Sequence, residues 1–425
     1  MNKQNRGLII AAPASGSGKT TITLGLLRAL SRRGPVRGAK SGPDYIDPRF
    51  HEAACGVPCP NLDGWAMSGN RIAALAQGDG PLIVEAAMGL FDGAPPDGTG
   101  SAAQLAKTLD LPVVLVVDCA KAAQSIAALV KGFVTFDPDI RINGLILNKL
   151  GSARHERIVK QALAGCDLPP VLGAVPRQAD LLHPSRHLGL VQAGERPDLE
   201  DFLNRAAVII EECIDLESLV FSPIADAAHA PRLAPPAQKI AIAQDQAFAF
   251  TYPHIIDDWR AAGAEILPFS PLADDAVPEA DFIFLPGGYP ELHAGRIANN
   301  ASFVNSMREA SEYTDIYGEC GGYMVLGDGL TDADGQRHQM LGLLQLETSF
   351  HARKLHLGYR RLDAQHGPFQ GLYAGHEFHF ATTLRAEGAP LFDAQDAEGE
   401  KLPPMGLRQG RICGSFAHVI DRILP

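Results

Sequence analysis

A glycine-rich motif near the start of the chain has the residues and spacing of a phosphate-binding loop. Residues 12–21 contain the block Gly16-x-Gly18-Lys19-Thr20, in which glycines let backbone N–H groups close around phosphate oxygens. Lys19 would reach the β- and γ-phosphates, and Thr20 would ligate Mg²⁺. The motif therefore predicts an ATP site, whose residues we expect to be Ser15, Gly16, Ser17, Gly18, Lys19, Thr20 and Thr21.

Two positions of this loop depart from related patterns. Pro13 stands where the standard loop begins with glycine, although the strand, loop and helix follow in the required order. Ala14 stands where one subclass of P-loop ATPases, which positions cellular cargo, carries an extra lysine. The second departure argues against a switch protein of that subclass.

A second motif, residues 318–322, has the Gly-x-Cys-x-Gly pattern of a nucleophile elbow. Its glycines permit a tight turn from strand to helix, and the start of the helix favours a thiolate. Cys320 is the predicted nucleophile and His418 the base that activates it, with His376 and His379 as rival bases. The alternative is a buried structural cysteine between flexible glycines.

A pair of glycines, Gly287 and Gly288, follows another predicted strand upstream of the elbow. A loop of this kind can direct backbone N–H groups at a developing oxyanion. We therefore expect these two residues to contact the substrate of the thiol.

Carboxylates and amides lie at the carboxyl ends of several predicted strands, the edge at which open α/β sheets bind ligands. Glu85, at the end of the strand predicted at residues 82–85, is therefore predicted to ligate Mg²⁺ together with Thr20. Asp47, in the turn-rich segment 40–48, is predicted to be a further Mg²⁺ ligand at the lip of the pocket. The other predicted contacts are Lys40, Asp44 and Tyr45 with an anionic substrate, Asn148 with the adenine edge, and Asp118 as a further crevice carboxylate.

The elements that must position these residues alternate between strands and helices. Short apolar runs predict strands, and amphipathic stretches predict helices between them, which together indicate a doubly wound α/β fold with a parallel sheet. The strands are predicted at residues 7–12, 82–85, 112–118 and 142–148, and the helices at 20–33 and 125–133.

A change in composition divides the chain into two domains. Residues 222–238 are rich in proline and alanine without periodicity and are predicted to be a linker. Residues 1–221 form the predicted ATP-binding domain and residues 239–425 a second α/β domain, with strands at 239–243, 281–285 and 315–317.

The bulk composition excludes several classes of function. With 37 basic and 49 acidic residues the 425-residue chain has a net charge of −12, which disfavours binding to nucleic acid or to an anionic membrane. No apolar run is long enough to span a membrane, so we expect a cytoplasmic protein. The seven cysteines show no disulfide pattern, and the pair Cys55 and Cys59 lacks the second pair that a metal site needs.

With these motifs placed, the chain resembles the cobyrinate or hydrogenobyrinate a,c-diamide synthases of corrinoid biosynthesis over nearly its whole length. The strings Asp-Tyr-Ile-Asp-Pro and Met-Gly-Leu-Phe-Asp-Gly are specific, whereas the loop and the elbow alone are generic. The resemblance rests on residues 15–20, 42–48, 85–93, 186–190, 285–291, 318–322 and 375–379.

The resemblance implies a P-loop NTPase domain similar to dethiobiotin synthetase, followed by a class I glutamine amidotransferase domain. It implies that ATP phosphorylates the a and c acetate carboxylates of a corrinoid and that ammonia from glutamine displaces the phosphate. The sequence of residues 11–16 is most similar to that of the family branch whose members act on metal-free hydrogenobyrinate.

The same resemblance assigns Cys320 as the nucleophile and His418 as its activator. Many glutaminases of this class carry a carboxylate two residues after the histidine, where this chain has Ile420, so Glu377 and Asp421 are only candidates for a third member. Arg177, Arg186 and His187 are candidate anion contacts.

Two alternatives stay open at this point. A related cofactor amidotransferase, such as a cobyric acid synthase, would differ in its carboxylate substrate and not in its mechanism. A P-loop ATPase switch fused to an inactive glutaminase-like module is disfavoured by Ala14 and by the intact Cys320. The order of the amidations and the oligomeric state, including a homodimer, are not determined by the sequence.

Overall fold

The computed structural model describes residues 5–178, 192–225, 227 and 230–424, and the chain divides into two compact units, Met1–Pro231 and Arg232–Pro425. The candidate anion contacts Arg186 and His187 lie outside the described residues. Each unit is described by itself.

The first unit is built on one sheet whose strands follow the order β3-β2-β4-β1-β5-β6-β7. These strands are parallel, and β8 adds to β1 in the antiparallel direction. The strands are β1 (Arg6–Ala11), β2 (Arg37–Ser41), β3 (Asn61–Leu62), β4 (Leu82–Glu85), β5 (Val113–Asp118), β6 (Ile142–Leu150), β7 (Val171–Pro176) and β8 (Ser222–Pro223).

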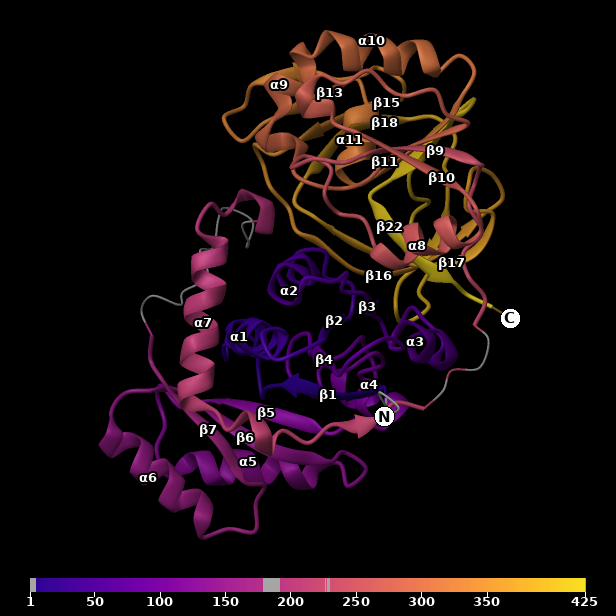
Figure 1. The fold of residues 1–425 in the computed structure, drawn as a ribbon. Coiled ribbons are helices and arrows are strands. Elements are labelled where there is room, and N and C mark those ends of the chain that lie inside the picture. Colours follow the sequence, from indigo (N-terminus) through magenta and orange to yellow (C-terminus); the bar gives the residue numbers. More distant parts are fainter. Residues whose placement is uncertain (1–4, 179–191, 226, 228–229, 425) are drawn as a thin grey trace. The chain divides into compact units, whose positions relative to one another are not determined.

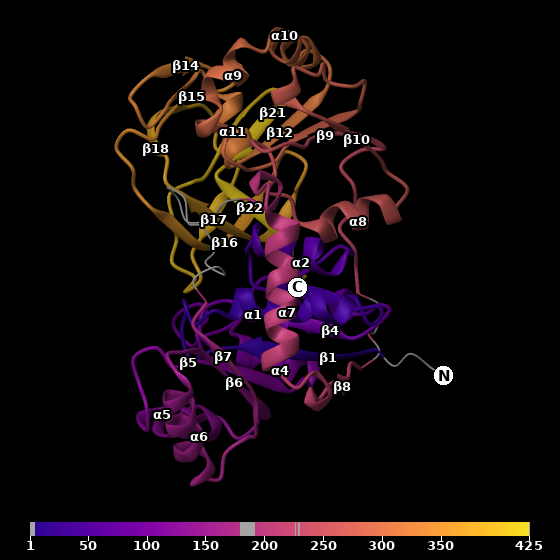
Figure 2. The same cartoon turned by 60° about the vertical axis from the view of Figure 1, so that its left-hand side comes forward.

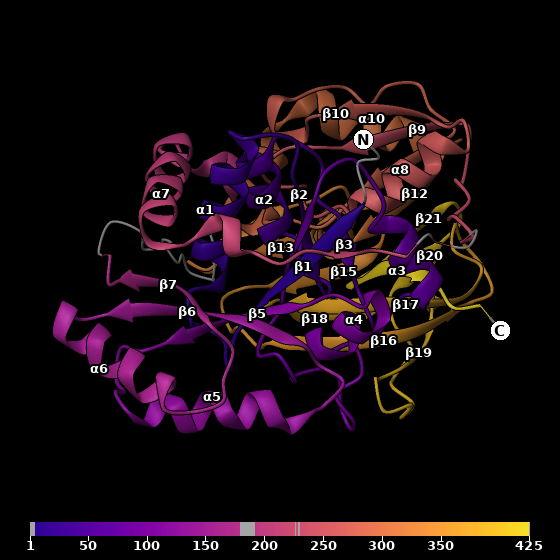
Figure 3. The ribbon, with the colours of Figure 1, turned by 60° about the horizontal axis from the view of Figure 1, so that its bottom comes forward.

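Helices cover both faces of this sheet (Figure 1), with α1 and α7 on one face and α5 and α6 on the other. Figure 3 shows α5 and α6 running along β5, β6 and β7. The helices are α1 (Lys19–Ser31), α2 (Asp47–Cys55), α3 (Gly69–Leu75), α4 (Ala102–Leu109), α5 (Ser125–Phe136), α6 (Ala153–Ala164) and α7 (Leu199–Cys213), with short 3₁₀ turns η2 (Ala193–Glu195) and η3 (Leu216–Ser218).

The strands at the centre of the sheet explain why the fold is doubly wound. Strands β1, β4 and β5 are continuous apolar runs that are buried from end to end apart from the first residue of β1 and the last of β5. A strand buried on both faces needs helices above and below it, because one layer cannot cover both sides. The predicted fold class is confirmed, and the predicted strand positions agree to within two residues at each end.

The second unit contains a mixed sheet in the order β10-β9-β11-β12-β21-β20, which is parallel except where β20 meets β21. Helix α11 lies beside β12 and β21 (Figure 2). The elements around this sheet are β9 (Lys239–Ala243), β10 (Glu265–Phe269), β11 (Phe282–Leu285), β12 (Asp315–Glu319), β20 (Leu407–Gln409), β21 (Ile412–Ser415), α8 (Pro253–Ala261), α9 (Ala294–Asn299), α10 (Ala301–Ala310), α11 (Gly321–Leu326), η4 (Pro271–Ala273) and η5 (Pro290–Leu292).

Two further four-stranded sheets complete the second unit. One follows the order β14-β13-β15-β18 and the other β19-β16-β17-β22. Their strands are β13 (Gly329–Thr331), β14 (Arg337–Gln339), β15 (Gln345–Ser349), β16 (His356–Ala364), β17 (Gly371–His379), β18 (Thr382–Glu387), β19 (Asp393–Gln395) and β22 (Ala417–Arg422). The sequence patterns had not predicted these sheets, which bring the histidine-rich residues 376–379 beside the end of the chain.

Among the described residues, no helix combines the length and the apolar composition that a membrane crossing requires. The segment predicted as a linker begins within the first unit, since Ser222 pairs with Gly7 of β1.

Candidate active sites

The phosphate-binding loop connects β1 to α1 and is shaped by its own hydrogen bonds. Gly18 stands before α1 with a φ of 91°, a left-handed conformation that glycine adopts without strain. The Ser17 hydroxyl donates to the carbonyl of Ala14 at 2.8 Å. The Lys19 ammonium donates to the carbonyl of Met88 at 2.5 Å. The loop is therefore joined to the segment that follows β4.

The loop is also held from the carboxyl end of β6. The amide of Asn148 donates to the Ser17 carbonyl at 2.9 Å, and the Lys149 ammonium donates to the Gly16 carbonyl at 2.6 Å. A Cβ on Gly18 would stand 2.3 Å from the Asn148 amide nitrogen, so only glycine allows this approach. Lys149 also pairs with Asp118 at 2.7 Å. In this structure Asn148 thus orients the loop, and its contact with an adenine remains a prediction.

Glu85, at the end of β4, is the centre of a buried group of charges. Its Oε1 accepts from the Thr20 hydroxyl at 2.6 Å and from the Lys40 ammonium at 2.9 Å. Its Oε2 lies 2.6 Å from Nε2 of His51 on α2, and Lys40 also pairs with Asp47 at 2.5 Å. The structure therefore brings together the three predicted metal ligands and the predicted substrate contact Lys40.

The electrostatics of this group follow from burial and from the neighbouring charges. Burial alone would raise the pKa of Glu85, but Lys40 and His51 outweigh it and hold that pKa well below its usual range. Burial also disfavours the charged form of Lys40, yet Asp47 and Glu85 outweigh it and raise its pKa. Burial and Asp44 raise the pKa of Asp47 to about 6, although Lys40 opposes them. The group contains two carboxylates, Asp47 and Glu85, and one permanent cation, Lys40.

The oxygen donors of Thr20, Asp47 and Glu85 fit Mg²⁺ in kind, because this ion prefers hard carboxylate and hydroxyl ligands. Lys40 lies between the two carboxylates, where it balances part of their charge. Burial lowers the pKa of Lys19, which stands beside the group, and Glu85 opposes this effect. A buried lysine of this kind is stabilised in its charged form by an anion such as a phosphate.

The remaining predicted residues of this region have structural contacts. Oδ1 of Asp44 accepts from the backbone N–H groups of Ile46 and Asp47 at 2.7 and 3.0 Å, which fixes the start of α2. Tyr45 is buried. Their contact with substrate stays a prediction.

His51 was missed by the sequence analysis. The pattern of α2 gave no signal for it, since a lone histidine on a helix is more often structural. Its position became visible only when α2 placed its ring against Glu85, 34 residues along the chain.

The candidate nucleophile of the second unit stands in a strained turn. Cys320 joins β12 to α11 with φ 45° and ψ −102°, an unfavourable conformation for a residue with a side chain. Its N–H donates to the Ser415 carbonyl at 2.8 Å, which helps to hold the turn. The thiol is 3% exposed, and burial raises its pKa. A nearby base is therefore needed to form a thiolate.

His418 on β22 lies next to this thiol and is fully buried. A Cβ built on Gly287 would stand 3.0 Å from Nε2 of His418 and 3.3 Å from Cβ of Cys320, and only 2.3 Å from the imidazole carbon between the two ring nitrogens. The predicted nucleophile, base and glycine loop therefore meet at one point. Gly287 has no room for a side chain there.

A carboxylate that the sequence analysis did not consider completes this arrangement. Oε2 of Glu319, the residue before the nucleophile, lies 3.4 Å from Nδ1 of His418. Glu319 is 3% exposed. The signal in the sequence was a glutamate inside the elbow motif at the end of a strand, a place where an apolar residue is the ordinary choice.

The rival bases have other partners. His379 bonds through Nε2 to Glu377 at 3.0 Å, and Glu377 also pairs with Arg360 at 2.7 Å. Burial would raise the pKa of Glu377, but His379 and Arg360 outweigh this effect and lower that pKa to about 2. Burial, His418 and Arg360 lower the pKa of His376 to about 3. Glu377 is therefore committed to an ion-pair network with Arg360.

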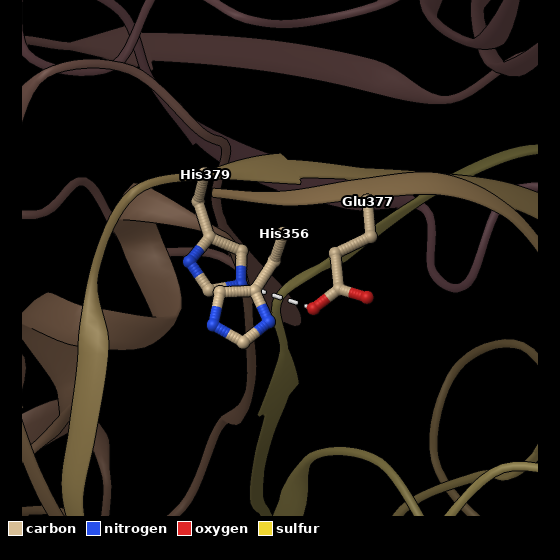
Figure 4. Close-up of side chains that lie close together, drawn as sticks. All are labelled: His356, Glu377 and His379. Carbon is tan, nitrogen blue, oxygen red and sulfur yellow. Dashed lines mark hydrogen bonds and ion pairs between the residues drawn. The ribbon is translucent and has the colours of Figure 1, made fainter. Parts of the chain in front are cut away.

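His356, Glu377 and His379 form a cluster that could be read as a metal site (Figure 4). Two strands build it, because His356 of β16 stands opposite His379 of β17. The two imidazole rings, however, are stacked with centroids 4.6 Å apart and planes only 6° apart. An ion bound in the plane of one ring would lie outside the plane of the other. In this arrangement the cluster suits an ion-pair network better than a metal ion.

Each unit of the chain matches a known domain family. Residues 8–191 match the model of the CobQ/CobB/MinD/ParA nucleotide binding domain, and residues 239–422 match the CobB/CobQ-like glutamine amidotransferase domain. A hydrogenobyrinate a,c-diamide synthase of Brucella anthropi is 55% identical, with 98% of each chain covered.

The chain belongs to the hydrogenobyrinate a,c-diamide synthase family. Synthases of this family from a Sinorhizobium species and from Rhizobium meliloti are 53% and 52% identical, over 98% of this chain and 98% and 99% of theirs. As a family member with a glutamine amidotransferase domain, the chain is an amide-forming ligase. A solved glutamine amidotransferase matches with a TM-score of 0.24 and 17% identity, over 33% of this chain and 70% of that one, which is too low to support a shared fold.

Proposed function

We propose that this protein amidates the a and c acetate carboxylates of hydrogenobyrinate, with ATP as energy source and glutamine as nitrogen donor. The observation that carries the proposal is the presence of two separate buried constellations, one for phosphate and one for a thiol, in a chain 55% identical to such a synthase. Residues 1–221 would form the amide synthetase domain and residues 239–425 the glutaminase domain, joined by residues 222–238.

In the first unit the residues of the loop would hold the phosphates. Bound ATP would supply the phosphoryl group that converts the poor electrophile of an acetate into an acyl phosphate. Lys19 and the loop N–H groups would offset charge on the transferred group. Thr20, Asp47 and Glu85 would hold Mg²⁺, which would contribute further positive charge. Ammonia would then attack the carbonyl carbon, and phosphate would leave.

In the second unit Cys320 would release that ammonia from glutamine. Its Sγ would lose its proton to Nε2 of His418 and attack the side-chain carboxamide carbon. The carbon–nitrogen bond would then break, and the leaving nitrogen would take the proton from His418. Water would hydrolyse the resulting thioester and yield glutamate. Gly287 and Gly288 would support the oxyanion that forms in both steps.

Mass spectrometry of the corrinoid products tests this proposal. Purified protein is incubated with ATP, Mg²⁺ and glutamine, and with either hydrogenobyrinate or cobyrinate. We expect two amides on hydrogenobyrinate, dependent on each of the three additions. Two amides on cobyrinate alone would assign the other branch, and no amide on either would exclude the substrate class.

A further inference from the structure

The carboxylate of Glu319 is held on one side by two hydrogen bonds. Its Oε1 accepts from the backbone N–H of Val419 at 3.0 Å and from the Tyr317 hydroxyl at 3.2 Å. Both donors are buried, as is the carboxylate. These bonds fix the plane of the carboxylate and leave its second oxygen for another partner.

That second oxygen faces the imidazole of the predicted base. Oε2 lies 3.4 Å from Nδ1 of His418, and the opposite nitrogen, Nε2, lies on the side of Gly287 and Cys320. The three side chains are thus arranged in the order carboxylate, imidazole and thiol. A contact of this length in an unliganded site commonly tightens into a hydrogen bond when substrate binds.

The two carboxylates suggested by the sequence are placed differently. Asp421 stands opposite Ala374, and a register shift in the pairing of β17 with β22 separates it from His418. Its Oδ1 accepts from the backbone N–H of Arg422 at 2.9 Å. Glu377 stands opposite Ala417 and not opposite His418, and its oxygens pair with Arg360 and His379. The ion-pair contact of His418 in the described residues is with Glu319.

We propose that Glu319 is the residue that positions His418 for its reaction with Cys320. By accepting a hydrogen bond from Nδ1–H, the carboxylate holds the tautomer whose Nε2 is free to take the proton from the thiol. The same carboxylate stabilises the imidazolium that exists until the proton passes to the leaving nitrogen. Glu319 touches no reacting atom and acts through His418 alone.

The substitution Glu319→Gln tests this role with little change in shape. The glutamine can still accept from Val419 and Tyr317 through its amide oxygen, but it presents an NH₂ group to His418. This group favours the tautomer with the proton on Nε2, which cannot accept the thiol proton. We expect kcat for glutamine hydrolysis to fall by roughly 10²-fold or more, with KM for glutamine within about twofold of wild type.

Three further measurements separate positioning from a structural role. Glu319→Asp should recover part of the lost kcat, because it restores the charge at a shorter reach. Glu312→Gln, at an exposed glutamate of the same unit, should leave kcat unchanged. Urea unfolding of the second unit, followed by Trp259 fluorescence in a Trp65→Phe background, should have a similar midpoint in Glu319→Gln and in wild type, which shows that this unit of the variant is folded.

The inference rests on the proposed glutaminase activity, and the two can fail separately. If Cys320→Ala retains glutamine hydrolysis, the proposed function itself is wrong. If Cys320→Ala abolishes hydrolysis while Glu319→Gln hydrolyses glutamine within about twofold of wild type, only the role of Glu319 is overturned. Equal losses of kcat in Glu319→Gln and Glu319→Asp, with loss of the urea unfolding transition of the second unit, would also overturn it, since they would mark a structural residue.

Discussion

Each unit contains a buried glutamate close to its candidate catalytic residues, and the surroundings shift the pKa values of the two glutamates in opposite directions. Glu85 has a hydroxyl, an ammonium and an imidazole as partners, and its pKa is held well below the usual range. Glu291, four residues after Gly287, has a buried Oε2 with no hydrogen-bond partner among the described residues, and burial raises its pKa to about 8.

The difference shows what each region is built to do. The first region keeps its carboxylates charged in the fold, as is needed to hold a cation and to work beside phosphate. In the second region burial instead favours the neutral form of Glu291, and the position of one proton between Cys320 and His418 decides the chemistry. The phosphate site therefore requires carboxylates that stay charged, and the thiol site requires a proton at a defined position. The chain meets these two requirements in separate units.

The largest effect is expected from removal of the thiol. Cys320→Ala should abolish glutamine-dependent amide formation, because no thioester can form, and leave ammonia-dependent formation intact. Product analysis with each nitrogen donor measures both activities. Cys413→Ala is the matched control, since Cys413 is also buried in this unit, with a pKa that burial raises to about 12. Loss of both activities in Cys320→Ala would contradict the division of chemistry between the units.

Removal of the loop lysine should have the converse result. Lys19→Ala should lower amide formation by roughly 10²- to 10³-fold with either nitrogen donor, because charge on the transferred phosphoryl group is no longer offset. Glutamine hydrolysis measured alone should persist. Lys160→Ala, which removes an exposed lysine paired with Glu156 on α6, is the control and should leave both activities unchanged. A Lys19→Ala protein that forms amides at the wild-type rate would exclude this loop as the ATP site.

Removal of the charge on Glu85 should lower the stability of the first unit as well as its activity. Glu85→Gln removes the charge that balances Lys40 and His51 in a buried site, and should lower the free energy of unfolding of the first unit by roughly 3 kcal/mol. Trp65 fluorescence in a Trp259→Phe background follows that unit during urea denaturation. Glu52→Gln on α2 is the control, because its pair with Arg49 is partly exposed and contributes at most about 1 kcal/mol. A change of equal size in both variants would show that the partners of Glu85 do not stabilise the fold.

The sequence predicted the edge of the sheet at which the first site forms, because parallel strands bring their carboxyl ends together. Thr20, Lys40 and Glu85 are therefore close to one another as expected. The sequence could not predict that Lys40 lies between Asp47 and Glu85 or that His51 joins them, since side-chain pairing depends on how α2 packs.

In the thiol site, too, the sequence predicted individual residues but not the pairing of their side chains. The elbow motif identified Cys320, and the resemblance identified His418. The role suggested for Glu319 depends on contacts between positions far apart, since Glu319 and Val419 are 100 residues apart in the chain. No periodicity in the sequence reports such a pairing, because it depends on the register of β12 with β21, which places Glu319 opposite Ser415, shortly before His418 in the chain.

Glu291 gives the most direct test of the comparison between the units. The pKa of Glu291 is raised from 4.5 to about 8 in the fold, so between these values the unfolded chain has lost a proton that the folded chain keeps. Stability must therefore fall as pH rises through this window. Glu291→Gln cannot titrate, and its free energy of unfolding should fall less between pH 5 and pH 8 than that of wild type, by roughly 3–4 kcal/mol.

Trp259 fluorescence in a Trp65→Phe background follows the second unit in urea at each pH, and the exposed Glu312→Gln serves as control. The pH dependence of wild type and of Glu312→Gln should coincide. If Glu291→Gln also coincides with them, the pKa of Glu291 is not raised in the fold. The contrast that we draw between Glu85 and Glu291 would then be wrong.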